Sequence, residues 1–175
     1  MYAAIANGGT IWKPTVAKAI ISNNGKVIKT FESEKLGDIG VSPEIIAFLH
    51  DALHEVTVSG TSAGVFAGFP LATAGKTGTA QVFGKNPNGR AKDDSAWYAS
   101  FAPAAKPRYV AVMMVSQGGF GASTSAVGIR KIYETLFGAK GGKIDQAASL
   151  FPTGKPPVKL PKISPATRPA GEKKK

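Results

Sequence analysis

The chain has 175 residues and an ordinary globular composition, 43% hydrophobic and 9% aromatic, which suits one domain with a sizeable core. Its net charge is +11, but residues 139–175 hold nine basic and two acidic residues, so the charge says more about that segment than about a binding face. The absence of cysteine excludes disulfides and thiolate metal sites, and no apolar run approaches the length needed to span a bilayer.

The N-terminal elements are predicted from their capping and turn residues. Residues 1–7 form a predicted helix that ends at Gly8-Gly9, because glycine readily adopts the left-handed conformation of a C-terminal cap. This helix has no N-cap and little length, so we expect the chain to start within a larger domain. Two β-prone runs, residues 16–22 and 26–31, are joined by Asn23-Asn24-Gly25, which predicts a hairpin.

A longer helix follows an expected loop over residues 33–40. Ser42 is a preferred N-cap and Pro43 suits the first helical position, so the helix should begin there. Gly60 should end it, and residues 60–68 are expected to be a loop of small residues. Apolar residues at helical spacing predict one buried face, made of Ile45, Ile46, Leu49, Leu53 and Val56.

Three β-strands and a closing helix are predicted next. The strands cover residues 74–81, 96–101 and 109–115, and a polar excursion over residues 83–94 follows the first of them. A short connection indicates that the last two strands are antiparallel. A helix over residues 123–137 has its apolar residues largely on one side. The predicted fold class is α+β, an antiparallel sheet with helices packed on its faces.

The composition changes after Gly138. Six prolines alternate with Lys and Ser, and the chain ends in three lysines. Such a segment has too little apolar surface to offset the entropy lost on ordering. We therefore expect a folded unit, residues 1–138, and a disordered Pro/Lys-rich tail, residues 139–175. The tail has a single aromatic residue, Phe151, on which a base could stack, so no nucleic-acid partner is expected.

The stretch Ala74–Gln81 carries the strongest chemical signal. Lys76 brings a compact positive charge with three donors, and the Thr77 and Thr79 hydroxyls can bind a carboxylate or relay a proton. Gly75 and Gly78 lack a Cβ and allow another backbone to come close. Such a strand can accept a peptide as an added strand and hold its carboxylate. The competing interpretation is a surface strand, since Lys-Ser/Thr-Gly occurs by chance in roughly one in ten chains of this length.

Two other motifs point to different chemistry, and neither is complete. A phosphate-binding P-loop needs a glycine five residues before Gly75, where the chain has Pro70. The sequence His50-Asp51-Ala52-Leu53-His54 resembles a zinc-binding His-Glu-x-x-His helix, but Asp replaces Glu and no third histidine exists. The two histidines are better explained as partly exposed polar positions on an amphipathic helix. No metal or cofactor is therefore expected.

The order of several motifs resembles a known family. After the opening Ala-Ile-Ala-Asn-Gly-Gly helix come the hairpin, the second helix, Gly60-Thr61, the segment 75–81 and Trp97-Tyr98-Ala99-Ser100-Phe101-Ala102-Pro103. This order resembles the C-terminal portion of the transpeptidase domain of penicillin-binding proteins of class B, the monofunctional type, over residues 1–138. The resemblance implies the C-terminal part of a β-lactamase/transpeptidase-like fold.

The catalytic motifs of this family are Ser-x-x-Lys, Ser-x-Asn and Lys-Thr-Gly. Lys76-Thr77-Gly78 supplies the third, but no serine is followed by Lys three positions later. Ser22-Asn23-Asn24 matches the second motif by letter, but it falls in the predicted hairpin turn, whereas the family's motif lies upstream of the opening helix. The resemblance thus implies that the nucleophile, its lysine and the second serine would precede Met1.

The resemblance also implies acyl transfer in peptidoglycan. In the family a serine attacks the penultimate D-alanine carbonyl of a stem peptide ending in D-Ala-D-Ala and expels the terminal D-alanine. The acyl group then passes to an amine on a neighbouring peptide, and β-lactam antibiotics are trapped by the same serine. On this chain, Lys76 would supply positive potential and help position the proton-relay serine. Thr77 and Thr79 would bind the substrate or antibiotic carboxylate, and the Thr79 backbone N–H would be half of the oxyanion hole.

The remaining expectations concern the surroundings of this site. Gly78 and Gln81 complete the expected substrate-binding set, with Gln81 at its margin, and Trp97 is expected in the core because large rings beside an apolar strand usually pack. The upstream part of the domain is an expected partner, and the outer face of the bacterial cytoplasmic membrane is the implied location, in cell division or elongation. The alternative hypothesis is a non-catalytic module that uses the same strand to hold a D-Ala-D-Ala-like or β-lactam carboxylate.

Overall fold

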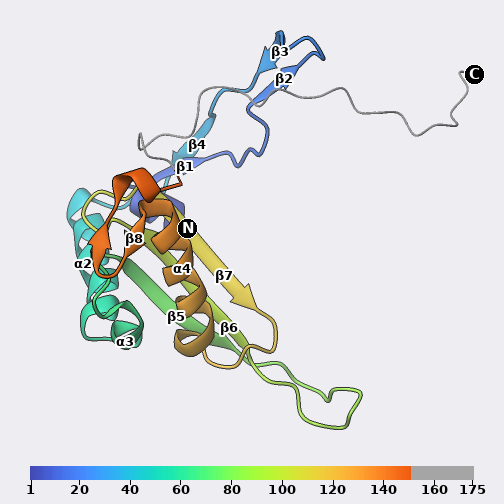
Figure 1. Cartoon of the computed structure of the whole chain (residues 1–175), viewed down its shortest axis with the longest axis vertical. Helices are drawn as coiled ribbons and strands as arrows, with labels where there is room; N and C mark the ends of the chain where they lie inside the picture. Colours follow the sequence, from blue (N-terminus) through green and yellow to red (C-terminus); the bar gives the residue numbers. More distant parts are fainter. Residues whose placement is uncertain (151–175) are drawn as a thin grey trace, which may run out of the picture.

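A three-stranded antiparallel sheet is the centre of this computed structural model, which describes residues 1–150 (Figure 1). The strand order is β5-β6-β7, so β5 and β7 form its two edges. Every residue of β5 has a partner in β6, from Ala74 opposite Phe101 to Ala80 opposite Ser95. The predicted α+β class and antiparallel pairing are confirmed. The strands are β5 (Ala74–Ala80), β6 (Ser95–Ala102) and β7 (Tyr109–Val115).

Helix α4 (Val127–Phe137) covers one face of this sheet, as Figure 1 shows. It continues directly from a π-helical turn, Ala122–Ala126, so the predicted closing helix is confirmed. Tyr98 from β6 packs with Ile129 and Tyr133 from α4, and all three are fully buried. Gly138 adopts the left-handed conformation that ends α4, as expected for a glycine C-cap.

Helix α2 (Pro43–Val58) packs against β5, and its start is as predicted: the Ser42 hydroxyl accepts a hydrogen bond from the Ile45 N–H, and Pro43 occupies the first turn. The short helix α1 (Tyr2–Ala6) is also confirmed. Ile5 and Ala6 of α1 join Ala74 and Phe101 in a second, smaller core. These two helices therefore position the N-terminal end of β5.

Two short antiparallel strand pairs extend from the sheet and its helices at the upper end of Figure 1. The predicted hairpin is confirmed as β2 (Ala19–Ile21) and β3 (Val27–Thr30). The expected loop over residues 33–40 is wrong, because β4 (Lys35–Asp38) pairs there with β1 (Thr10–Trp12). The expected loop over residues 60–68 is also interrupted by helix α3 (Ala63–Phe66), whose Phe66 is buried in the core.

The segment just after Gly138 contains regular structure. Strands β8 (Ala139–Lys140) and β9 (Lys143–Ile144) form a hairpin, and Gln146–Ala148 is a 3₁₀ turn. The Leu150 N–H donates to the Thr135 carbonyl at 3.0 Å, which returns the chain onto α4. The expectation of disorder is therefore corrected for residues 139–150, and the rest of the expected tail, residues 151–175, lies outside the described residues. Across residues 1–150, no helix has the length and apolarity that a membrane crossing requires.

Candidate functional site

Strand β5 carries the predicted site residues along one edge of the sheet. Lys76 is exposed, and its Nζ donates to the Thr77 carbonyl at 3.0 Å. Thr77 is half-buried, whereas Thr79 is exposed. Gln81 lies just beyond the end of the strand and is also exposed. Within residues 1–150 no strand pairs with the outer edge of β5, so the backbone N–H and C=O groups along that edge have no strand partner.

The pairing register divides these side chains between the two faces of the sheet. Lys76 lies opposite Ala99 and Gly78 opposite Trp97, so these four share one face. Thr77 and Thr79 lie on the other face, since their partners alternate with those. The ammonium group and the hydroxyls are therefore brought together only along the open edge. A ligand lying along that edge can contact both kinds of group.

Thr77 has a hydroxyl partner that the sequence analysis did not identify. The Oγ1 atoms of Thr61 and Thr77 are 2.9 Å apart, which is a hydrogen bond. Thr61 lies in the turn between α2 and α3, sixteen residues before its partner. Its only signal in the sequence was its place in the Gly60-Thr61 motif, which does not reveal the contact.

Tyr98 supports the site from behind β5. Its OH lies 3.0 Å from the Ser62 hydroxyl, and both residues are fully buried. Burial raises the pKa of Tyr98 to about 12, and the hydrogen bond between Tyr98 and Ser62 opposes that rise. A Cβ on Gly75 would lie 2.5 Å from the Tyr98 hydroxyl oxygen. Gly75 therefore has no side chain because the tyrosine occupies that space.

The expectation that Trp97 belongs to the core is wrong. Its side chain lies on the face opposite Tyr98, away from α4, and it is 40% exposed. Three residues of β7 on the same face are also exposed: Val110, Val112 and Met114. A strand pattern alone cannot tell which face is covered, because that depends on the elements packed against the sheet.

His50 and His54 bind backbone atoms. His50 Nε2 lies 2.9 Å from the Ile5 carbonyl oxygen, and His54 Nδ1 lies 2.7 Å from the Thr73 carbonyl oxygen. Both residues are half-buried, and they link α2 to α1 and to the segment that leads into β5. Among the residues that the structure describes, no group of three His, Cys, Asp or Glu could hold a metal ion.

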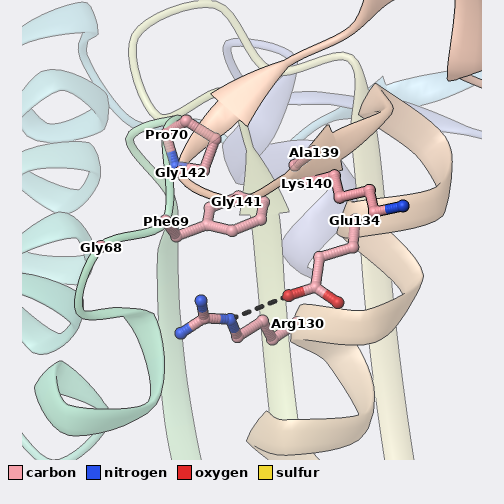
Figure 2. A pocket seen from close by; sticks show the side chains of 9 residues that line it. All are labelled: Gly68, Phe69, Pro70, Arg130, Glu134, Ala139, Lys140, Gly141 and Gly142. Carbon is pink, nitrogen blue, oxygen red and sulfur yellow. Dashed lines mark hydrogen bonds and ion pairs between the residues drawn. The ribbon is translucent and has the colours of Figure 1, made fainter.

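A separate pocket of about 170 Å³ lies between the α3–β5 connection and the β8–β9 hairpin (Figure 2). Arg130 of α4 pairs with Glu134 at 3.1 Å across its floor. The same guanidinium donates to the Val65 carbonyl and, at 3.1 Å, to the Ala67 carbonyl. Its donors are thus used to join α4 to α3. None of the predicted site residues lines this pocket.

Comparison with known proteins gives a consistent result. Residues 1–134 match the family described as "Penicillin binding protein transpeptidase domain". The peptidoglycan D,D-transpeptidase MrdA of Haemophilus influenzae is 30% identical over 142 residues, covering 74% of this chain and 21% of MrdA. PbpA of Mycolicibacterium smegmatis is 32% identical over 117 residues, covering 67% of this chain and 23% of PbpA. The chain thus spans about a fifth of the length of these curated relatives.

Solved structures agree with the sequence matches. PBP2 of Pseudomonas aeruginosa, in complex with WCK 5153, has a TM-score of 0.66 and 27% identity, over 82% of this chain and 29% of that one. The penicillin G acyl-enzyme complex of penicillin-binding protein A from M. tuberculosis has a TM-score of 0.61 and 26% identity, over 77% of this chain and 30% of that one. The described fold is therefore similar to part of each of these larger chains.

Proposed function

Because the chain belongs to the penicillin-binding protein transpeptidase domain family, we propose that it is the portion of a peptidoglycan D,D-transpeptidase that supplies the Lys76-Thr77-Gly78 strand. The observation that carries this proposal is the open edge of β5. That edge presents an exposed ammonium and an exposed threonine hydroxyl within four residues. Cation and hydroxyl donors that meet at one strand edge suit a carboxylate, and a free strand edge suits an extended peptide.

Each residue has a role in the proposed reaction. The substrate is a stem peptide ending in D-Ala-D-Ala, whose carboxylate Thr77 and Thr79 bind, with Gly78 and Gln81 beside it. A serine from outside these 175 residues attacks the penultimate carbonyl carbon. The Thr79 N–H donates to the developing oxyanion, and Lys76 stabilises the negative charge and orients the proton-relay serine. The C–N bond then breaks, the terminal D-alanine leaves as an amine, and an acceptor amine later takes the acyl group.

The same groups account for proposed β-lactam binding. Penicillin G forms an acyl-enzyme complex with the similar M. tuberculosis protein. Such antibiotics carry a carboxylate next to a strained amide, so the donors that hold the peptide carboxylate also suit the drug. We place the complete protein at the outer face of the bacterial cytoplasmic membrane, where the reaction's substrate is found.

The upstream part of the domain is the proposed partner of the open sheet face. Trp97, Val112 and Met114 together leave a row of large apolar side chains exposed on β6 and β7. Exposed apolar rows of this kind are unfavourable in water and are usually covered by another element. Covering them with the polypeptide that carries Ser-x-x-Lys would also bring the nucleophile to the domain that holds Lys76.

Covalent labelling with a fluorescent penicillin tests the proposal. The 175-residue chain alone should show no labelled band, because no serine in it has the activating lysine. Co-folding it with an upstream polypeptide that carries Ser-x-x-Lys should restore labelling. Lys76→Met should lower the labelling rate by about 10²-fold, the range seen when an electrostatic donor is removed from an acyl-transfer site. Lys85→Met, an exposed lysine outside β5, is the matched control.

Two results would contradict the proposal. Labelling of the chain alone would show that it contains a nucleophile we have missed. Equal labelling by the Lys76→Met and Lys85→Met complexes would show that β5 takes no part in the chemistry. If the chain binds a D-Ala-D-Ala peptide reversibly but no upstream polypeptide restores penicillin labelling, the non-catalytic binding module would be favoured instead.

A further inference from the structure

We propose that Thr61 is a positioning residue that orients the Thr77 hydroxyl toward the carboxylate of a bound ligand. This inference rests on the proposed function, in which Thr77 contacts that carboxylate. Its observation is the hydrogen bond of 2.9 Å between the two Oγ1 atoms. The contact gives the Thr77 hydroxyl a partner in the turn that contains Thr61.

The turn that carries Thr61 is held rigidly at the end of α2. The N–H groups of Ser59 and Gly60 donate to the Glu55 carbonyl at 2.9 and 3.0 Å. The Ser62 N–H donates to the Val56 carbonyl at 3.1 Å, and the Ser62 hydroxyl donates to the same oxygen at 3.0 Å. These bonds use the free carbonyls of the last helical turn. The bonds of its neighbours therefore hold the backbone of Thr61 beside β5.

The same turn is also bonded to strand β6 of the sheet. The buried Ser62 hydroxyl lies 3.0 Å from the Tyr98 OH, and Tyr98 is the β6 residue directly opposite Thr77. Tyr98 can reach Ser62 because Gly75 leaves space for its hydroxyl. Three contacts thus connect these residues. Thr77 lies opposite Tyr98 in the sheet, Tyr98 contacts Ser62, and the neighbour of Ser62, Thr61, bonds to Thr77. A connected hydrogen-bond network of this kind restricts the rotamers of its members.

The chemistry of a hydroxyl explains the consequence for a ligand. Each threonine hydroxyl has one proton to donate and two lone pairs. When Thr61 donates to Thr77, the Thr77 proton remains available for an anionic oxygen beyond the edge of β5. A carboxylate accepts hydrogen bonds and cannot donate them, so it favours this direction of the Thr61–Thr77 bond. Lys76 contributes from the same segment, since its bond to the Thr77 carbonyl uses one of three ammonium protons.

NMR of the 175-residue chain tests the contact directly. Three-bond couplings to the Thr77 methyl carbon report its χ1 angle, and they should indicate a single rotamer in the wild-type chain. Thr61→Val keeps the shape of the side chain but removes the hydroxyl, and it should average these couplings. Thr61→Ser keeps the hydroxyl and should preserve them. Thr135→Val, an exposed threonine on α4, is the control and should leave them unchanged.

Titration with N-acetyl-D-Ala-D-Ala extends the test to the ligand. Thr61→Val should weaken binding about five-fold, the effect of one ordinary hydrogen bond, while Thr61→Ser stays within about twofold of wild type. Averaged Thr77 couplings in the wild-type chain, or unchanged couplings in Thr61→Val, would overturn the inference. If the couplings behave as expected but the dipeptide moves no β5 resonance, the Thr61 contact is supported and the proposed carboxylate site is refuted.

Discussion

Replacing Gly75 by alanine should destabilise the protein strongly, because the new methyl group has no room. Its Cβ would lie 2.5 Å from the Tyr98 hydroxyl oxygen, 2.7 Å from Tyr98 Cζ and 2.9 Å from Ser100 Cβ. All three atoms belong to fully buried residues, so none can move into solvent. Overpacking of this kind costs about 1–3 kcal/mol. Displacing Tyr98 also breaks its hydrogen bond with Ser62, worth about 1 kcal/mol.

The expected loss is therefore about 2–4 kcal/mol in the free energy of unfolding. Urea unfolding followed by circular dichroism measures it, and a slope of about 2 kcal/mol per molar predicts a midpoint lower by roughly 1–2 M. Gly64→Ala is the matched control, since its Cβ would meet no atom within 4 Å in helix α3. That variant should be neutral or gain up to about 1 kcal/mol, because alanine is the better helix former.

A double variant separates the clash from other effects of alanine. Tyr98→Phe removes the nearest atom but leaves Cζ at 2.7 Å, so adding it to Gly75→Ala should recover part of the loss. If the free energy of unfolding of Gly75→Ala is within about 0.5 kcal/mol of the wild-type value, Tyr98 moves freely and the reasoning about close packing behind β5 is wrong.

Three further predictions concern the buried tyrosines and the exposed apolar residues. Burial raises the pKa of Tyr98 to about 12 from an unfolded value of 10.0, and it also raises the pKa of Tyr133. The contribution of the protonated tyrosines to the free energy of unfolding is therefore fully present below pH 10 and is lost as pH rises toward 12. The urea midpoint should fall over that range, and it should fall less in Tyr98→Phe. Both tryptophans, Trp12 and Trp97, are at least 40% exposed, so acrylamide should quench the emission of the folded chain readily, and a blue-shifted, protected emission would contradict the assigned face. Val112 is 56% exposed in the apolar row, so the isolated chain should self-associate with rising concentration, and Val112→Lys should reduce this in sedimentation experiments, whereas a strictly monomeric wild-type chain would count against an uncovered interface.

Local signals in the sequence were sufficient for several elements. Ser42 and Pro43 marked the start of α2 because an N-cap and a first-turn proline act within one helical turn. Asn24-Gly25 marked the β2–β3 hairpin because its turn is closed within residues 22–26. The Lys76–Gly78 segment was likewise recognised as a strand, since its neighbours in the chain are apolar and β-branched. In each case the residues that decide the structure are adjacent in the chain.

Tertiary structure decided what depends on distant residues. The pairing of β1 with β4 joins short strands about 25 residues apart and leaves no alternating pattern to read. Trp97 is exposed because α4 covers the other face of β6, and the residues of β6 do not determine which face α4 covers. The Thr61–Thr77 hydrogen bond exists because α2 ends beside β5. The sequence by itself thus determined which chemical groups β5 carries, whereas only packing determined their faces and partners, because those follow from contacts between segments far apart in the chain.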